Sequence, residues 1–308
     1  MTIGALCLLD TVPRTFDDAQ LRQLVLAATV VNDQLELLRR LEPTAAATLA
    51  EARALTEAVD DGQILPHYQP IVQLRDSGIV GVEALARWQH PVHGLLPPGA
   101  FIPLAEDTDI IIDLDLAILR QAATDLARWT RRHPELRLSV NLSARHFDHP
   151  DCIQRLTDTV LAAHSDPAWI SFEVTETIAL ANHLDDRNFL LELRQAGFQV
   201  LLDDFGTGFS SLDQLLHLPI DGIKLDRTLT AALHTHAGQA ITRALLTLAD
   251  ELHLHTVIEG IETPEQATAA QALCGRIGQG YLWAAALPAA AVEAHFRTRG
   301  RQAFDSDE

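Results

Sequence analysis

Val200-Leu201-Leu202-Asp203-Asp204-Phe205-Gly206 is the stretch that decides the fold of this chain. Its three leading apolar residues stop at two adjacent aspartates, which is typical of a buried strand of a parallel sheet. The chain continues with Thr207-Gly208-Phe209-Ser210-Ser211. We interpret this continuation as a loop that closes over a bound ligand, or as an ordinary strand-to-helix turn with a serine at the helix N-cap.

The same alternation of short apolar runs and longer amphipathic stretches extends in both directions, from about residue 64 to residue 300. The eight candidate strands are Leu65–Val72, Val80–Ala86, Leu138–Leu142, Ile170–Val174, Val200–Leu202, Gly222–Leu225, Thr256–Ile258 and Ile277–Leu282. Eight strands that alternate with helices predict an α/β fold of the TIM (β/α)8 barrel type. An open doubly wound sheet is the competing architecture, but no Gly-x-Gly-x-x-Gly turn follows the first run, as dinucleotide binding there requires.

Polar residues recur where these runs end. They are Glu83, Asn141, Glu173, Glu176, Asp203, Asp204, Lys224, Asp226, Glu259, Glu262 and Gln279. Any one of them alone is more often a solvated charge or a cap, but their recurrence on consecutive strands favours one shared barrel mouth. Carboxylate and amide oxygens suit Mg²⁺ or Mn²⁺, and paired carboxylates such as Asp203 and Asp204 can bridge two ions for phosphoryl transfer.

Lys224 lies among these acids in the sequence pattern. An amine at this place can orient or deprotonate an attacking water and balance the negative charge. The alternative is a structural salt bridge between Lys224 and Asp226.

The composition excludes several classes of protein. The 308 residues carry 42 acidic and 23 basic side chains, a formal net charge of −19, which argues against binding of polymeric nucleic acid. The three cysteines, Cys7, Cys152 and Cys274, are far apart, so we expect buried reduced thiols rather than disulfides or a thiolate metal site. No apolar run is long enough to span a bilayer and no signal peptide is evident, so we expect a cytoplasmic protein without membrane insertion.

The first residues form a separate pattern. Residues 3–16 predict a strand and a Pro13 turn, and residues 17–41 predict a long amphipathic helix with apolar residues at heptad spacing from Leu21 to Leu38. Such a pair cannot bury its apolar faces alone. It must dock on the barrel, pair with a second chain, or belong to a longer protein, and we expect a parallel helical homodimer.

Several ordered motifs together resemble the EAL-domain phosphodiesterases, which hydrolyse the bacterial second messenger cyclic di-GMP. The motifs are Tyr68-Gln69-Pro70-Ile71-Val72, Glu83-Ala84-Leu85-Ala86-Arg87-Trp88, Phe101-Ile102-Pro103-Leu104-Ala105-Glu106, Asn141-Leu142-Ser143, Glu173-Val174-Thr175-Glu176, the loop from Asp203 to Leu212, Lys224-Leu225-Asp226, Glu259-Gly260-Ile261-Glu262 and Gln279-Gly280-Tyr281. The resemblance covers about residues 48 to 298. It implies a modified barrel in which one strand runs against the others.

The resemblance also implies roles for single residues. The implied metal ligands are Glu83, Asn141, Glu173, Asp203 and Asp204, and the implied catalytic residues are Lys224, Glu259 and Glu176. Lys224 and Glu259 would handle the attacking water, and Glu176 would anchor the loop that follows Asp204. The implied substrate contacts are Gln69, Arg87, the backbone around Leu104, and Gln279, with Glu262 in a structural role. The implied reaction is hydrolysis of cyclic di-GMP to linear pGpG by a metal-activated water, with a two-metal site that holds Mg²⁺ or Mn²⁺.

Two departures from the family pattern bear on substrate binding. Ile258 stands where the family usually has alanine and could crowd the floor of the site, and Ala285 stands where the family has arginine. No metal-binding position is replaced, so we favour an enzyme over an inactive cyclic di-GMP receptor or a hydrolase for another phosphodiester.

The expected organisation has three parts. Residues 1–42 are similar to the last strand and helix of a GAF sensory domain, residues 43–300 form the barrel, and residues 301–308 form a disordered tail.

Overall fold

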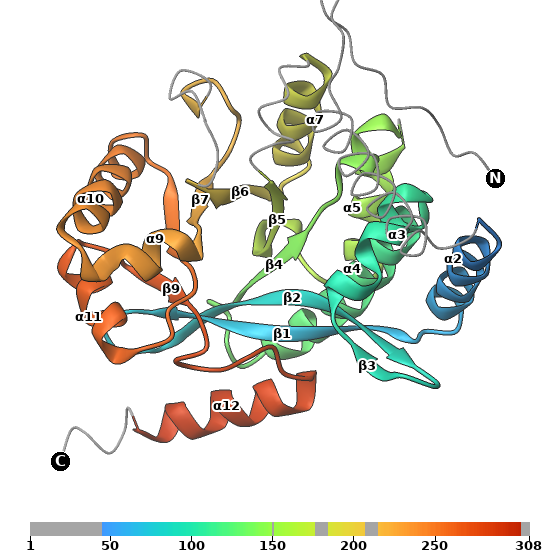
Figure 1. The fold of residues 1–308 in the computed structure, drawn as a ribbon, viewed down its shortest axis with the longest axis horizontal. Helices are drawn as coiled ribbons and strands as arrows, with labels where there is room; N and C mark the ends of the chain where they lie inside the picture. The colour runs from blue at the N-terminus through green and yellow to red at the C-terminus, as the bar shows by residue number, and fades with distance from the viewer. Residues whose placement is uncertain (1–44, 150, 176–183, 207–214, 303–308) are drawn as a thin grey trace, which may run out of the picture. The chain divides into compact units, whose positions relative to one another are not determined.

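The computed structural model describes residues 45–149, 151–175, 184–206 and 215–302 (Figure 1). The chain divides into two compact units, Met1–Ala54 and Leu55–Glu308, and the barrel lies in the second. The predicted N-terminal strand, the heptad helix and the GAF-like remnant lie outside the described residues. No helix among the described residues has the length and apolar character needed to cross a membrane.

The described residues alternate between strands and helices. The strands are β1 (Ile64–Gln73), β2 (Ile79–His90), β3 (Gly94–Leu96), β4 (Arg137–Asn141), β5 (Ile170–Thr175), β6 (Gln199–Phe205), β7 (Gly222–Leu225), β8 (His255–Ile258) and β9 (Ile277–Gln279). The α-helices are α2 (Ala45–Asp60), α3 (Ile102–Asp107), α4 (Ile110–Trp129), α5 (Cys152–Ala162), α7 (Leu184–Gln195), α9 (Arg227–Ala231), α10 (His236–Glu251), α11 (Pro264–Ala272) and α12 (Ala289–Gln302).

Eight strands close into a barrel. The hydrogen-bonded order is β1-β9-β8-β7-β6-β5-β4-β2, and β2 pairs with β1 to complete the ring. β1 runs antiparallel to both of its neighbours, whereas the other barrel pairs are parallel. The predicted modified (β/α)8 barrel with one antiparallel strand is therefore confirmed.

The outward face of the barrel forms the main core. Outward-pointing side chains such as Val140, Phe172 and Leu202 are almost fully buried. α4 lies against β1 and β4, and its apolar residues recur at helical spacing on the buried face. Each such Leu, Val or Phe side chain contributes about 1.5–3 kcal/mol by its burial.

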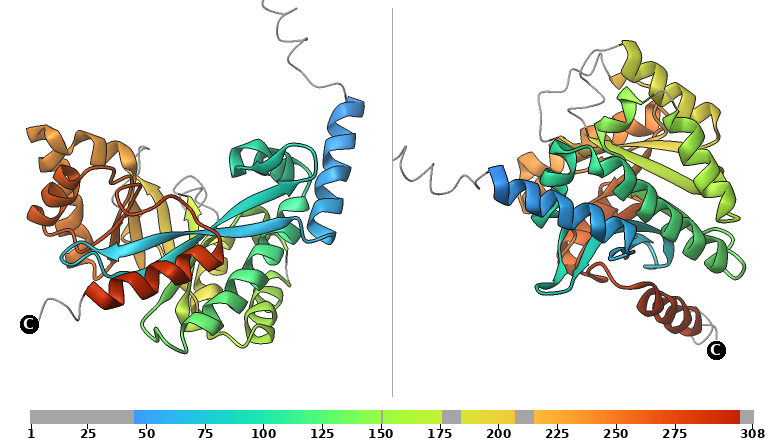
Figure 2. Two further views of the ribbon diagram at one scale, coloured as in Figure 1. Left: turned by 90° about the horizontal axis from the view of Figure 1, so that it is seen from below. Right: turned by 90° about the vertical axis from the view of Figure 1, so that its right-hand side faces the viewer.

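α12 lies along β1 on the outside of the barrel (Figure 2). A polar network connects β1, α4 and α12. The Tyr68 hydroxyl donates to Asp125 at 2.6 Å, and Arg128 forms ion pairs with Asp125 at 3.0 Å and with Glu293 of α12 at 2.9 Å. Because Tyr68 and Asp125 are both buried, this network fixes β1 against α4.

Several expectations need correction. The strand predicted over Ile277–Leu282 ends at Gln279, because the chain turns there and the Leu282 amide donates to the Ile261 carbonyl. The short strand β3, which forms a hairpin with β2 outside the barrel, was not predicted. Cys152 is buried, but Cys274 is exposed, and Cys7 lies outside the described residues. α12 ends at Gln302, so residues 301 and 302 of the predicted tail are helical, and residues 303–308 lie outside the described residues.

Candidate functional site

The strand register places one layer of polar side chains inside the barrel. Residues paired across neighbouring strands point to the same face of a sheet, and residues two apart on one strand share that face. The pairs Gln69 with Glu83, Asn141 with Glu173, and Thr175 with Asp203 therefore share the inner face. The inner layer consists of Gln69, Glu83, Asn141, Glu173, Asp203, Lys224 and Gln279.

A β-bulge brings both aspartates of β6 to this layer. Leu202 pairs with Ile223 and Phe205 with Leu225, so two residues of β6 stand opposite the single residue Lys224. Asp204 has a φ of 55°, a left-handed conformation that aspartate adopts more readily than most residues. Without the bulge, Asp203 and Asp204 would point to opposite faces, so the bulge allows both carboxylates to serve one site.

Lys224 lies at the centre of a shell of carboxylates. Its Nζ is 2.8 Å from Glu173, 2.6 Å from Glu259, 3.3 Å from Asp203 and 3.4 Å from Glu83, and its side chain is 1% exposed. We call these four residues the carboxylate shell. One ammonium cannot neutralise four carboxylates, and buried charge without a counterion is costly. The shell therefore favours an additional cation.

Amide side chains complete the floor of the site. Gln279 Nε2 donates to Glu83 at 2.6 Å and to Gln69 Oε1 at 3.1 Å. Asn141 Nδ2 donates to Glu83 at 3.1 Å, and Gln69 Nε2 donates to the Ala284 carbonyl at 3.2 Å. Two amides and the Lys224 ammonium thus orient the Glu83 carboxylate.

Burial and charge move the pKa values of these acids apart. Burial, together with the Glu83 charge, raises the pKa of Glu173 well above its ordinary value. Burial raises the pKa of Glu259 to about 7 and also raises the pKa of Asp204. Burial acts on Glu83 in the same direction, but Lys224, Gln279 and Asn141 outweigh it and lower the pKa of Glu83. Such a crowded acid group is typical of a functional site.

The donor set fits divalent cations. Glu173 Oε1 and Asp203 Oδ1 are buried and accept no hydrogen bond, although Asp203 Oδ1 lies 3.3 Å from Lys224 Nζ, so both oxygens can still coordinate a cation. Carboxylate oxygens of Asp203, Asp204 and Glu259 lie within 4.8 Å of one another. Oxygen donors without histidine or cysteine suit Mg²⁺ or Mn²⁺ rather than zinc.

Two cavities meet at the carboxylate shell. One, of about 460 Å³, is lined mainly by apolar residues of β2, β4, α3 and α4, including Ile102, Ile111 and Leu142. The other, of about 210 Å³, lies on the β7–β9 side and is lined by Lys224, Glu259 and Gln279 among others. Glu83, Leu85 and Asp203 line both cavities, so a ligand can occupy both and place its centre at the acids.

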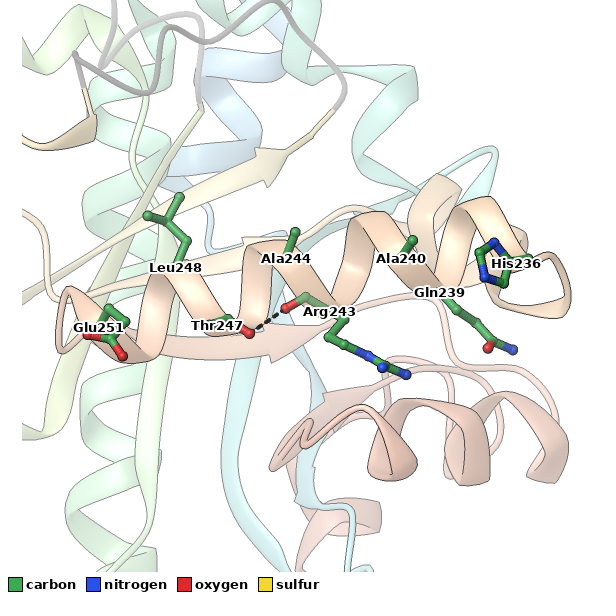
Figure 3. Close-up of a pocket in the computed structure, with 8 residues that line it drawn as sticks. All are labelled: His236, Gln239, Ala240, Arg243, Ala244, Thr247, Leu248 and Glu251. Carbon is green, nitrogen blue, oxygen red and sulfur yellow. Dashed lines mark hydrogen bonds between the residues drawn. The ribbon is translucent and has the colours of Figure 1, made fainter.

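A third pocket has a different character. It follows one face of α10, from His236 to Glu251, as Figure 3 shows. It contains none of the inner-layer residues, so we do not assign the chemistry to it.

The structure brings most of the predicted site residues together. Glu83, Asn141, Glu173, Asp203, Asp204, Lys224, Glu259, Gln69 and Gln279 all lie at the barrel mouth. Glu176 and the loop over residues 207–214 lie outside the described residues. Leu104 lies in α3, where its neighbours Ile102 and Pro103, rather than Leu104, line the larger cavity.

The side chains of Arg87 and Asp226 form hydrogen bonds with backbone groups rather than with the carboxylate shell. Arg87, half-buried on β2 just after Ala86, donates through its Nη1 to the Ala86 carbonyl at 2.8 Å. The alternative salt bridge of Lys224 with Asp226 is absent among the described residues, because the Asp226 carboxylate instead accepts from the Thr228 amide and caps α9. This leaves Lys224 wholly to the carboxylate shell.

Ile258 does not crowd the site. It pairs with Leu225, whereas Val257 pairs with Lys224, so Ile258 points outward. It packs against Gly275, where an added Cβ would lie 2.5 Å from Ile258 Cδ1. The extra bulk at Ile258 is thus accommodated by a glycine behind the barrel.

Comparisons with known proteins agree with this geometry. Residues 52–286 match the family described as the EAL domain. The cyclic di-GMP phosphodiesterase NbdA of Pseudomonas aeruginosa is 37% identical over 262 residues, which cover 84% of this chain and 33% of that protein. The probable cyclic di-GMP phosphodiesterase PdeB of Escherichia coli is 36% identical over 254 residues, which cover 82% of this chain and 47% of that protein. The chain thus spans a third to a half of the length of these relatives.

A solved structure shares the fold. The structure described as "PaMucR Phosphodiesterase, c-di-GMP complex" has a TM-score of 0.74 and 35% identity, covering 80% of this chain and 99% of that one. The family match, the closed barrel and its inner layer of acids agree with this likeness. The chain belongs to the EAL domain family.

Proposed function

We propose that this chain is a phosphodiesterase that hydrolyses cyclic di-GMP to linear pGpG and depends on Mg²⁺ or Mn²⁺. The observation that carries the proposal is the carboxylate shell, in which Glu173 Oε1 and Asp203 Oδ1 are buried and accept no hydrogen bond. The two cavities beside the shell support a ligand with two bases and central phosphates. The relatives NbdA and PdeB, which carry this activity in their names, support the choice of substrate.

The side chains of the site would have separate roles in binding the cations and the substrate. Glu83, Asn141, Glu173, Asp203 and Asp204 would hold the cations. Bound divalent cations would neutralise phosphate charge and lower the pKa of a water ligand. Gln69, Arg87, Gln279 and the backbone around Leu104 would bind and orient the substrate, and Glu176 would anchor the loop after Asp204.

Lys224 and Glu259 would act on the attacking water. They lie 2.6 Å apart at the mouth, so one donor and one acceptor can orient a water together. The water oxygen bonds to phosphorus while the bond from phosphorus to the 3′ oxygen breaks. The Glu259 carboxylate would take the water's proton, and the leaving 3′ oxygen would gain a proton from solvent.

The test is chromatography of cyclic di-GMP incubated with the protein and Mg²⁺ or Mn²⁺. We expect pGpG from the wild type and from Glu265→Gln, an exposed acid on α11 outside the site. Glu83→Ala should lower the rate by more than about 100-fold, since even outer-shell partners of metal ligands cost 10- to 100-fold. Substrate that the wild type binds but leaves cyclic would indicate a receptor instead. Equal product from Glu83→Ala would overturn the site assignment.

The N-terminal region adds a separate proposal. The heptad spacing from Leu21 to Leu38 supports a homodimer formed through a helix that resembles the end of a GAF domain. Sedimentation of the full chain and of a chain lacking residues 1–42 tests it: a strict monomer in both would overturn it.

A further inference from the structure

Three buried polar side chains form a chain of hydrogen bonds where α4 meets α5 (Figure 1). They are Asp115 of α4, His146 of the short 3-10 helix Ala144–Asp148, and Cys152, the first residue of α5. His146 Nε2 lies 3.1 Å from Asp115 Oδ2, and His146 Nδ1 lies 3.1 Å from Cys152 Sγ. The proposed chemistry uses none of these side chains, so their burial needs a separate explanation.

The direction of each hydrogen bond follows from the acceptors. Asp115 Oδ2 also accepts from the Ser143 amide, at 3.2 Å. Burial raises the pKa of Asp115, whereas His146 and the Ser143 amide act to lower it, so both donors favour the charged carboxylate. Because a carboxylate only accepts, the proton of a neutral His146 lies on Nε2, and its Nδ1 accepts from the Cys152 thiol. Burial raises the pKa of this thiol to about 12, which keeps its proton in place.

Asp115 connects this hydrogen-bond chain to Asn141, a proposed cation ligand. Asn141 is the last residue of β4, and the Leu142 amide after it donates to the Glu173 carbonyl at 2.9 Å, beside β5. The next amide, that of Ser143, donates to Asp115 instead. Asp115, Asn141 and Ser143 also line the larger cavity together. Loss of the Asp115 acceptor would therefore release the backbone just beyond Asn141.

The direction of the Asn141 side chain matters for a bound cation. Its Nδ2 donates to Glu83 at 3.1 Å, which leaves its Oδ1 for the cation. Groups that hold a ligand's place from outside the coordination shell affect metal affinity strongly, because a small displacement of the ligand oxygen weakens its bond to the metal. The backbone at the end of β4 is the link through which Asp115 reaches this oxygen.

We propose that Asp115 and His146 are positioning residues, which hold the end of β4 and thereby keep Asn141 in the geometry that binds the cation. The inference rests on the proposed function, in which Asn141 is one of the cation ligands. Asp115 acts through the Ser143 amide, and His146 acts by fixing the Asp115 carboxylate. Cys152 completes the hydrogen-bond chain by setting which ring nitrogen of His146 carries the proton.

The test is calorimetry of Mn²⁺ binding to the EDTA-treated full chain, a measurement that does not require turnover. Asp115→Leu removes the acceptor, whereas Asp115→Asn retains an oxygen that can take the place of Oδ2. His146→Leu removes the donor, whereas His146→Gln retains an Nε2 donor for Asp115. The matched control is Asp125→Leu, which removes another buried carboxylate of α4, the one that accepts from Tyr68. Thermal unfolding measures the stability of every variant.

Asp115→Leu and His146→Leu should weaken Mn²⁺ binding roughly 10-fold, the lower end of the range for outer partners of metal ligands. Asp115→Asn and His146→Gln should bind Mn²⁺ close to the wild-type affinity, because each retains the hydrogen bond. Asp125→Leu should lose stability and keep the wild-type affinity, because its partners lie on β1 and α4 rather than at the end of β4. Unchanged affinity in Asp115→Leu, or an equal loss in Asp125→Leu, would overturn the positioning role.

Nuclear magnetic resonance of protein labelled at the histidine ring nitrogens tests the hydrogen-bond chain itself. The His146 signals are those missing from His146→Gln, and we expect a proton on Nε2 and none on Nδ1. The reverse tautomer would overturn the hydrogen-bond chain. A wild type that gives the expected series of Mn²⁺ affinities but leaves cyclic di-GMP cyclic would overturn the proposed function alone, and one that binds no Mn²⁺ would overturn both.

Discussion

Lys224 is the residue on which the arrangement of the acids depends. It is the one base within 4 Å of the carboxylate shell among the described residues, and it contacts all four carboxylates. Burial acts to lower its pKa, but Glu173, Glu83, Glu259 and Asp203 outweigh burial and hold it well above the ordinary value. Lys224 therefore stays charged and keeps the acids in one geometry.

Replacing Lys224 with methionine should lower both stability and activity. The change keeps a long side chain but leaves the buried carboxylates without their ammonium, so the free energy of unfolding in EDTA should fall by about 3–5 kcal/mol. Urea unfolding of Lys224→Met and of Arg243→Met, a surface control, measures this. Equal stability of the two variants would show that the carboxylates are not held by Lys224.

At the scale of elements, the β6 bulge gives the site its second aspartate. The bulge adds one residue opposite Lys224 and puts Asp204 in the left-handed region. The two adjacent aspartates of β6 were evident in the sequence, but the bulge was not. Three apolar residues followed by two acids also fit a regular strand that ends before the acids. The bulge in β6, rather than the adjacency of two acids in the sequence, brings Asp203 and Asp204 to one site.

The strain at Asp204 should be measurable. Glycine adopts a positive φ freely, whereas alanine in the left-handed region costs roughly 1–2 kcal/mol, so Asp204→Gly should be more stable than Asp204→Ala by about 1 kcal/mol. Urea unfolding of both variants in EDTA makes the comparison, and each should lose activity because the carboxylate is gone. An alanine variant as stable as the glycine variant would contradict the left-handed bulge.

At the scale of the molecule, the sequence predicted the barrel and most of its site, for physical reasons. Seven of the eight apolar runs match strands closely, because barrel strands that are buried on both faces, such as β5 and β7, keep nearly continuous apolar runs. The family resemblance implied that one strand runs against the others but not which one, and the side-chain pattern could not identify β1, since alternation is the same in either direction. The three-residue strand β3 is too short to show a period. The outward direction of Ile258 depends on its register with Leu225, which a single sequence does not contain.

Removal of metal should lower the stability of the whole protein. A cation that binds the folded state alone stabilises it by about 2.7 kcal/mol at 100 times its dissociation constant. The midpoint of thermal unfolding should therefore rise when Mg²⁺ or Mn²⁺ is added to EDTA-treated protein, and the rise should be much smaller for Glu83→Ala. Sodium chloride at equal ionic strength is the control. An equal rise for the variant would place the bound cation elsewhere.

One reaction tests the central claim most directly: turnover of cyclic di-GMP with Mn²⁺ in water labelled with heavy oxygen, read by mass spectrometry of the product. Attack of water on phosphorus predicts linear pGpG with one heavy oxygen in its 5′ phosphate and none in its 3′ hydroxyl. Label in the 3′ hydroxyl, or substrate that stays cyclic, would contradict the assignment of this barrel mouth as a phosphodiesterase site.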